Sequence, residues 1–200
     1  MSQPQAPWTS TAPPDPVSDY ASRFAPPQAE VAIVVPEQAQ GRPMWFSVGP
    51  LKMVVMCMVT MQFYSVYWFY KQWKLVRERE QSSIIPALRA LFGIFFVYAL
   101  CTRVHASEGS AGAKLNVPAL AGGWIVTTVL WKLPDPYWWV AMAAPLFMMP
   151  VQAAMNAVNE IAAPGHDPNR RFSAWNWVAI VLGSLLLVMA LIGTFMPEQA

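Results

Sequence analysis

The chain changes from apolar to aromatic to basic over residues 63–80, which read FYSVYWFYKQWKLVRERE. Aromatic rings with polar tips favour the headgroup layer of a bilayer, and the lysines and arginines beyond them favour its negatively charged cytoplasmic side. The stretch therefore predicts a helix whose carboxyl end leaves a membrane. We expect this helix to be anchored at the membrane surface by Tyr67, Trp68, Lys71, Trp73, Lys74, Arg77 and Arg79.

The composition also favours a membrane protein. Hydrophobic residues make up 56% of the chain and charged residues only 12%, whereas about 25% of an average soluble domain is charged. The net charge of +2 is small, and the basic residues do not alternate with aromatic residues along one soluble face, which argues against a nucleic-acid partner. Both cysteines lie in apolar runs without metal-ligand spacing, so we expect no catalytic centre, metal or cofactor.

Prolines divide the chain into two parts. They are dense among glutamine, alanine and serine over residues 1–43, a composition that blocks both helix and sheet. We predict a disordered tail over residues 1–43 and a helical membrane domain over residues 44–200.

Apolar runs in the second part predict the membrane-spanning helices. About 20 helical residues cross a hydrocarbon core, and four runs approach that length, at about residues 51–70, 117–133, 137–158 and 175–196. A fifth run, residues 84–101, is interrupted by Arg89 and is therefore expected to be a short re-entrant, interfacial or tilted helix. The predicted fold class is all-α, a polytopic membrane protein with four full transmembrane helices plus this short one, and a five-span bundle is the alternative.

The distribution of basic residues predicts an orientation. If residues 84–101 stay on one side, most basic residues gather with Arg77 and Arg171, and only Arg42, Lys52 and Lys132 lie on the opposite side. Because cytoplasmic loops carry the excess of lysine and arginine, this arrangement places Arg77 and Arg171 in the cytoplasm and both termini outside.

A polar stripe crosses the fourth apolar run. Its four residues recur at steps of four, three and one, which is the spacing of one helix face. Polar groups at membrane depth face a bundle interior or a cavity, and Arg89 is the obvious opposite charge for the glutamate. The stripe has three interpretations: an exit turn at the interface, hydrogen-bonded helix packing, or a substrate or proton path. The candidate intramembrane polar face consists of Arg89, Gln152, Asn156, Asn159 and Glu160.

The chain resembles an uncharacterised bacterial inner-membrane protein family, a domain of unknown function with a YWFYKxWK helix exit. The matching pieces are YWFYKQWKL (67–75), PALRALF (86–92), LPDPYW (133–138), LFMMPVQ (146–152) and WNW (175–177). The resemblance implies a multi-pass protein of the bacterial inner membrane and transfers no catalytic residue.

We expect a non-enzymatic membrane component that packs with a second copy or with a protein partner inside the lipid bilayer. The alternative is a small transporter or channel subunit that uses the polar intramembrane face. A membrane enzyme acting on lipids ranks third, because no cluster of histidine, aspartate or cysteine accompanies the stripe.

Overall fold

Helix α7, Ala144–Ala162, lies at the centre of the packed core, in contact with α2, α5 and α6. The computed structural model describes residues 41–107 and 115–196, which all belong to one compact unit, Pro36–Ala200. The other unit, Met1–Val35, lies outside the described residues, as does most of the predicted tail. Over the described residues the fold is all-α and has no strand. The remaining helices are α2 (Pro50–Val59), α3 (Phe63–Glu80), α4 (Pro86–Leu91), α5 (Gly93–Ser107), α6 (Val117–Val129) and α8 (Ala174–Phe195), with 3-10 helices η2 (Leu130–Lys132) and η3 (Tyr137–Ala143).

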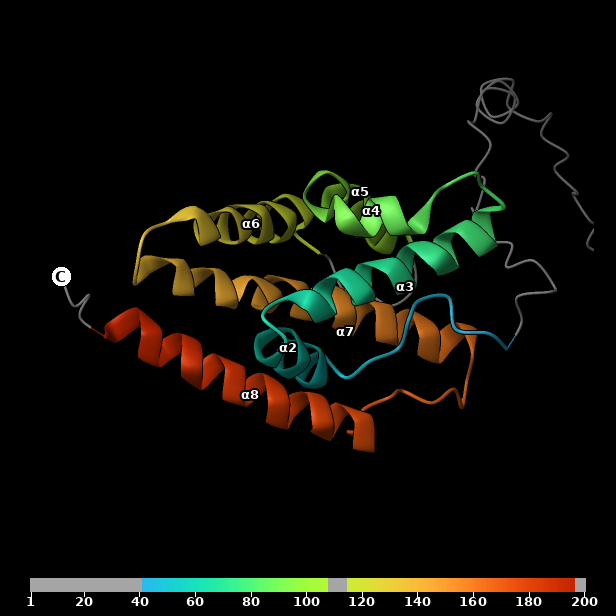
Figure 1. Cartoon of the computed structure of the whole chain (residues 1–200). Coiled ribbons are helices and arrows are strands. Elements are labelled where there is room, and N and C mark those ends of the chain that lie inside the picture. The colour runs from blue at the N-terminus through green and yellow to red at the C-terminus, as the bar shows by residue number, and fades with distance from the viewer. Residues whose placement is uncertain (1–40, 108–114, 197–200) are drawn as a thin grey trace, which may run out of the picture. The chain divides into compact units, whose positions relative to one another are not determined.

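The chain reverses direction between α2 and α3. The Thr60 hydroxyl donates to the Met56 carbonyl oxygen (2.7 Å) and accepts from the Tyr64 N–H (2.9 Å), so a side chain replaces a backbone partner there. Met61 and Gln62 then adopt left-handed conformations, with φ of 47° and 72°. Two successive left-handed residues cannot continue an α-helix. The prediction of one helix over residues 51–70 is therefore wrong, and the run forms a helical hairpin (Figure 1).

The short apolar run also differs from the prediction. Residues 84–101 contain two helices, because α4 ends at Leu91, α5 begins at Gly93, and α5 continues past Arg103 to Ser107. In Figure 1 α5 is seen nearly end-on, whereas α3, α6 and α7 run across the view. Helix α5 therefore crosses the other helices instead of running along them. The bounds of α6 with η2, of η3 with α7, and of α8 agree with the other three predicted runs within a few residues.

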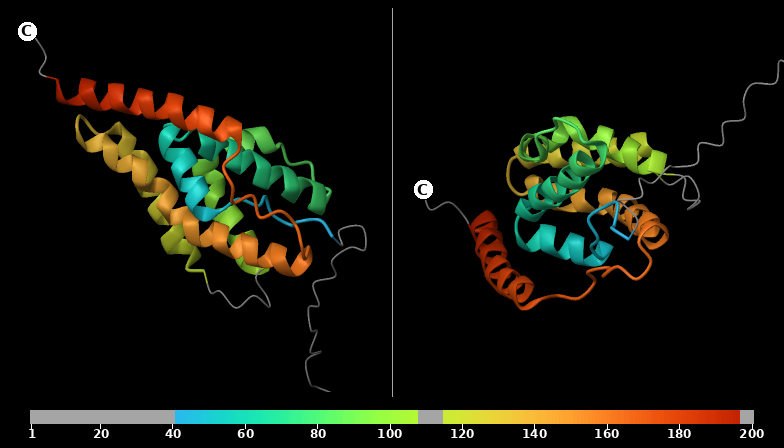
Figure 2. Two further views of the ribbon diagram at one scale, coloured as in Figure 1. Left: turned by 90° about the horizontal axis from the view of Figure 1, so that it is seen from below. Right: turned by 90° about the vertical axis from the view of Figure 1, so that its right-hand side faces the viewer.

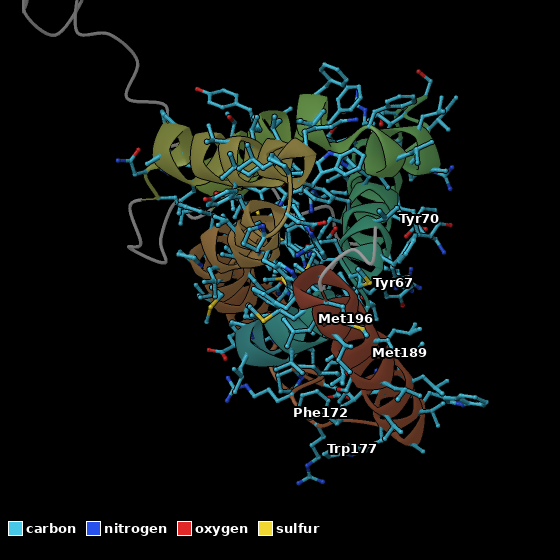
Figure 3. All side chains as sticks on the ribbon, turned by 60° about the vertical axis from the view of Figure 1, so that its left-hand side comes forward. Tyr67, Tyr70, Phe172, Trp177, Met189 and Met196 are labelled. Carbon is cyan, nitrogen blue, oxygen red and sulfur yellow. The ribbon has the colours of Figure 1, made fainter. Side chains whose placement is uncertain are left out.

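Helix α8 is the most exposed helix of the fold. It contacts α2, and large apolar side chains cover the rest of its surface. Figure 2 shows α8 along the outside of the other helices, and Figure 3 labels Trp177 and Met189 on it and Met196 directly after its end. Two helical stretches of the described residues are long and apolar enough to cross a membrane: Tyr137–Ala162, half of which is buried inside the protein, and Ala174–Phe195, with 6% buried.

The helices have two chemically distinct ends. At the first, which we call the basic end, α3 and α7 finish and α8 begins; Arg79 bonds to the Met44 carbonyl oxygen there, and Lys52 to that of Arg171. At the second, the turn end, Gln62 bonds to the Met142 carbonyl oxygen and Trp139 to Thr194. Contacts of Lys52, Arg79, Arg103 and Arg170 place these residues at the basic end, whereas Lys132 lies in η2, next to the turn end.

This arrangement corrects the predicted topology. Arg42 and Lys52 were expected opposite Arg77 and Arg171, yet Lys52 bonds directly to residue 171 and Arg42 lies two residues before Met44. The cause is the turn at Met61 and Gln62, which returns the chain to the end from which it started.

Candidate functional site

The least expected feature is an extended segment inserted between α3 and α7, residues 44–49, which we call the anchor segment. Trp45 and Val48 are fully buried in it, and Ser47 is nearly so. An extended segment that enters a core must find partners for its backbone N–H and C=O groups, because burying them unpaired costs free energy. Four side-chain amides supply most of these partners; we call Gln72, Gln152, Asn156 and Asn159 the amide clamp. Figure 1 shows the segment between the two helices.

Asn159 and Gln72 each bind both polar backbone groups of one residue. Asn159 Oδ1 accepts from the Trp45 N–H (2.9 Å), and its Nδ2 donates to the Trp45 carbonyl oxygen (2.8 Å). Gln72 Oε1 accepts from the Phe46 N–H (3.0 Å), and its Nε2 donates to the Phe46 carbonyl oxygen (3.2 Å). The two amides thus replace the partners that a neighbouring β-strand would supply. Both residues are 0% exposed.

Gln152 and Asn156 connect these pairs into one network. Gln152 Nε2 donates to the Phe46 carbonyl oxygen (3.2 Å) and to Asn156 Oδ1 (2.9 Å), while its Oε1 accepts from Trp68 Nε1. Asn156 Nδ2 donates to the Val48 carbonyl oxygen (2.9 Å). Every amide of the clamp therefore uses both its donor and its acceptor, which makes the network rigid and specific for one position of the segment.

Charged and polar residues hold the two ends of the anchor segment. At its start the Arg79 guanidinium donates to the Met44 carbonyl oxygen (2.8 Å) and lies 4.6 Å from the Trp45 ring centre. At its end Asn169 Nδ2 donates to the Ser47 carbonyl oxygen (3.2 Å). Lys52 Nζ in turn donates to Asn169 Oδ1 (2.8 Å). The loop after α7 is thereby tied to the same segment.

Comparison with known proteins adds no family to this geometry. No family model, curated protein or solved structure matches the chain. The resemblance to a bacterial inner-membrane family stays a prediction.

The structure brings together three of the four residues of the predicted stripe. Gln152, Asn156 and Asn159 share the buried face of α7, but Glu160 is exposed because one further residue rotates it by about 100° around the helix. Glu160 faces Arg170 at 3.8 Å. Arg89 lies instead against the rings of Trp73 and Phe96. The predicted pair of Arg89 with Glu160 is therefore wrong.

The predicted surface anchor divides into two groups. Tyr67, Lys71, Lys74 and Arg77 are exposed or half-buried on α3, and Lys74 forms an ion pair with Glu78 at 3.9 Å. Trp68 and Trp73 are 1% and 0% exposed, so they belong to the core and not to a membrane-surface belt. Arg79 is occupied by the anchor segment. The helix face, more than the residue type, decides which aromatic side chains remain outside.

Sequence reasoning missed Gln72 and the anchor segment itself. Gln72 is a neutral polar residue in a stretch that becomes charged, and the predicted surface anchor does not include it. A signal was present in the spacing: Trp68, Gln72 and Val76 recur every four residues and all three are buried. The anchor segment has no comparable signal, because its partners lie 26 to 122 residues away along the chain.

The clamp leaves little room for solvent. A cavity of about 10 Å³ lies near it, between Met53, Trp68 and Met148, which is room for at most about one water molecule. A larger cavity of about 310 Å³ lies at the turn end, lined chiefly by Met61, Gln62, Thr128, Trp131 and Trp138. The residues of the clamp line neither cavity. Within the described part of the chain no group of three histidine, cysteine, aspartate or glutamate side chains is placed to hold a metal ion.

Proposed function

We propose that this protein is a multi-pass membrane component without an enzymatic role, whose helices hold the anchor segment at the cytoplasmic face. Packing with a second copy or with a protein partner is the function that this arrangement serves. The bacterial inner membrane is the location that the resemblance implies.

Helix α8 supports the membrane location. The helix has 22 residues; its most apolar stretch of 18 residues has a mean hydropathy of 2.6, and only 6% of that stretch is buried inside the protein. At 1.5 Å per residue the helix extends about 33 Å, which matches a hydrocarbon core of about 30 Å. A helix that is apolar on every side and exposed on most of them is stable in lipid and unfavourable in water.

The charge distribution supports a revised topology. With basic residues concentrated at one end, the positive-inside rule assigns that end to the cytoplasm. The α2–α3 hairpin then enters from the cytoplasm and returns to it, α4 and α5 stay on that side, and α6, α7 and α8 cross. In this topology the anchor segment is cytoplasmic.

The amide clamp is the observation that carries the proposed role. Its polar groups are used up by the anchor segment, so they are not available to line a path for an ion or substrate. A filled bundle that holds one extended segment in place favours a scaffold over a channel.

Co-purification from membranes tests the proposal. We would compare the full chain, a chain lacking residues 1–40 and the double variant Gln72→Ala/Asn159→Ala, all extracted in mild detergent. We expect a second copy or one defined protein in fixed stoichiometry with the full chain, lost in the truncated chain and reduced in the double variant. A full chain that is monomeric and without a partner would contradict the proposed role.

A small transporter or channel subunit is the second candidate, favoured by the 310 Å³ cavity at the turn end. That cavity has the volume of a small-molecule site and contains three polar side chains, those of Gln62, Ser65 and Thr128. Solute flux into protein-containing vesicles that is abolished by Ala141→Trp, which fills the cavity, would support this function over the scaffold.

A further inference from the structure

A second cluster of charged residues lies at the basic end, beside the amide clamp but separate from it. It consists of Arg89 of α4, Arg103 of α5 and Glu80 at the end of α3, arranged around the Trp73 indole. The Arg89 guanidinium carbon is 4.5 Å from the centre of the Trp73 ring, and that of Arg103 is 5.5 Å from it. Two guanidinium groups from different helices thus share one aromatic platform.

The cluster contains more positive charge than its neighbours neutralise. Arg103 Nε donates to Glu80 Oε1 at 3.0 Å, whereas Arg89 forms no ion pair with any described residue. Arg89 instead lies against two rings that contact each other: its guanidinium carbon is 5.0 Å from the centre of the Phe96 ring, and the Phe96 and Trp73 ring centres are 6.3 Å apart. Burial and the nearby charge of Arg103 lower the pKa of Arg89, and the Glu80 carboxylate opposes them. Two guanidinium groups that share one carboxylate are stabilised by a further bound anion.

Two further polar atoms in this region lack partners. Trp73 is completely buried and its Nε1–H donates to no acceptor, and the Ser82 hydroxyl, two residues after Glu80, is also buried and unpaired. Buried donors without partners are rare in native proteins. The region therefore has a surplus of donors as well as a surplus of positive charge.

The guanidinium groups remain reachable from outside. The side chain of Arg103 is 34% exposed and that of Glu80 is 35% exposed. Leu88 and Phe92 next to Arg89, and Phe95 and Tyr98 on α5, are exposed apolar side chains. In the proposed topology this surface meets the cytoplasmic leaflet, where phosphate groups are abundant.

We propose that Arg89 and Arg103 form a binding site for a phosphate group, supplied by the headgroup of an anionic phospholipid or by free phosphate. Planar guanidinium groups bind phosphate oxygens through paired hydrogen bonds, and basic pockets between helices on the cytoplasmic side of membrane proteins bind anionic headgroups. Glu80 competes with the phosphate for Arg103, so it weakens the site and sets its affinity. The phospholipid source rests on the proposed membrane function; the phosphate chemistry does not.

Binding measured on the full chain in mild detergent tests the site. The probes are phosphatidylglycerol, phosphatidylcholine and inorganic phosphate, each added at increasing concentration and detected by native mass spectrometry for the lipids and by ³¹P line broadening for phosphate. We expect Arg89→Gln and Arg103→Gln each to weaken phosphatidylglycerol binding at least tenfold. Arg89→Lys, which keeps the positive charge but loses the paired N–H donors of the guanidinium, should weaken phosphatidylglycerol binding less.

The matched control is Arg77→Gln, which removes an exposed arginine at the end of α3 outside the cluster. We expect it to change the affinity less than threefold. Glu80→Gln has the opposite expected sign, because it removes the competing carboxylate and should strengthen binding severalfold. A variant that merely unfolds the region cannot produce this gain.

The outcomes separate the two sources. The ligand is an anionic lipid headgroup if free phosphate does not displace phosphatidylglycerol and phosphatidylcholine binds more weakly. The ligand is free phosphate if Arg89→Gln weakens the binding of inorganic phosphate as much as that of phosphatidylglycerol. Equal losses in Arg77→Gln and Arg89→Gln, or no gain in Glu80→Gln, would overturn the proposal. The partner recovered by co-purification is measured independently, so failure of this site leaves the scaffold proposal standing.

Discussion

Asn159 and Gln72 use their side chains as a β-strand uses its backbone, each donating to and accepting from a single residue. A net hydrogen bond contributes only about 1 kcal/mol, but a buried group left without its partner costs about 1–3 kcal/mol. Because of this asymmetry, the loss of any one amide should destabilise the clamp. A buried group without a partner costs more still if it is charged, which favours four neutral amides on the buried face.

We predict that Asn159→Ala destabilises the protein by at least about 2 kcal/mol, because the Trp45 N–H, the Trp45 carbonyl and the Ser47 hydroxyl all lose a partner. The measurement is thermal or denaturant unfolding in detergent. The control is the neighbouring Glu160→Gln, which removes an exposed ion pair and should cost less than about 1 kcal/mol. Equal effects of the two changes would mean that the anchor segment is not held by Asn159.

Two adjacent glycines of α6 have different expected tolerances. A methyl group at Gly123 would overlap the Phe147 ring of α7, whereas one at Gly122 would meet no atom within 4 Å. Gly123→Ala should therefore destabilise by about 1–3 kcal/mol through overpacking, and Gly122→Ala should be neutral or stabilise by up to about 1 kcal/mol through helix propensity. Unfolding curves of both variants measure these changes. A larger destabilisation by Gly122→Ala than by Gly123→Ala would mean that α7 packs against the other face of α6.

At the scale of helices, the sequence predicted the elements whose apolar character is continuous. The bounds of α6 with η2, of η3 with α7, and of α8 follow from hydropathy and from the prolines that stop them. The α2–α3 turn could not be predicted in this way, because Met61 and Gln62 adopt left-handed backbone conformations although neither is a glycine. Such a conformation is imposed by tertiary contacts and by Thr60, and it has no signature in composition.

The candidate site was predicted only in part for a related reason. Periodicity placed Gln152, Asn156 and Asn159 on one face of α7, since helix geometry depends on nearby residues alone. What that face contacts depends on residues 44–49 and on Gln72, which are distant in sequence. The direction of the stripe was thus predictable and its partner was not.

The contact between α8 and α2 depends on one glycine. A methyl group at Gly183 would overlap the backbone carbonyl of Val59, whereas Gly193 on the same helix has open space around it. We predict that Gly183→Ala separates α8 from α2 and that Gly193→Ala leaves the contact intact. Disulfide cross-linking between cysteines introduced on the two helices should decrease in the first variant only, and an unchanged yield in both would argue against this packing.

At the scale of the whole molecule, the distribution of charge and the course of the chain support each other. The hairpin brings Arg79, at the end of α3, back to Met44, which precedes α2, and Lys52 donates to the Arg171 carbonyl oxygen. Basic residues from three distant parts of the sequence therefore collect at one end. If residues 51–70 formed one straight span, Arg42 and Lys52 would lie on the opposite side of the membrane from Arg77 and Arg171. The proposed topology therefore satisfies the positive-inside rule better than the topology predicted from the order of the apolar runs.

Cysteine accessibility tests most directly whether Arg42, just before the anchor segment, and Arg77, near the end of α3, lie on the same side of the membrane. In a background with Cys57→Ala and Cys101→Ala, single cysteines would replace Arg42, Arg77 and Asp135, which are all exposed. An impermeant thiol reagent would be applied to intact cells and to inverted membrane vesicles. We predict that positions 42 and 77 react only in inverted vesicles and that position 135 reacts only in intact cells. Reaction of position 42 together with position 135 would contradict the hairpin, the position of the amide clamp and the topology derived from them.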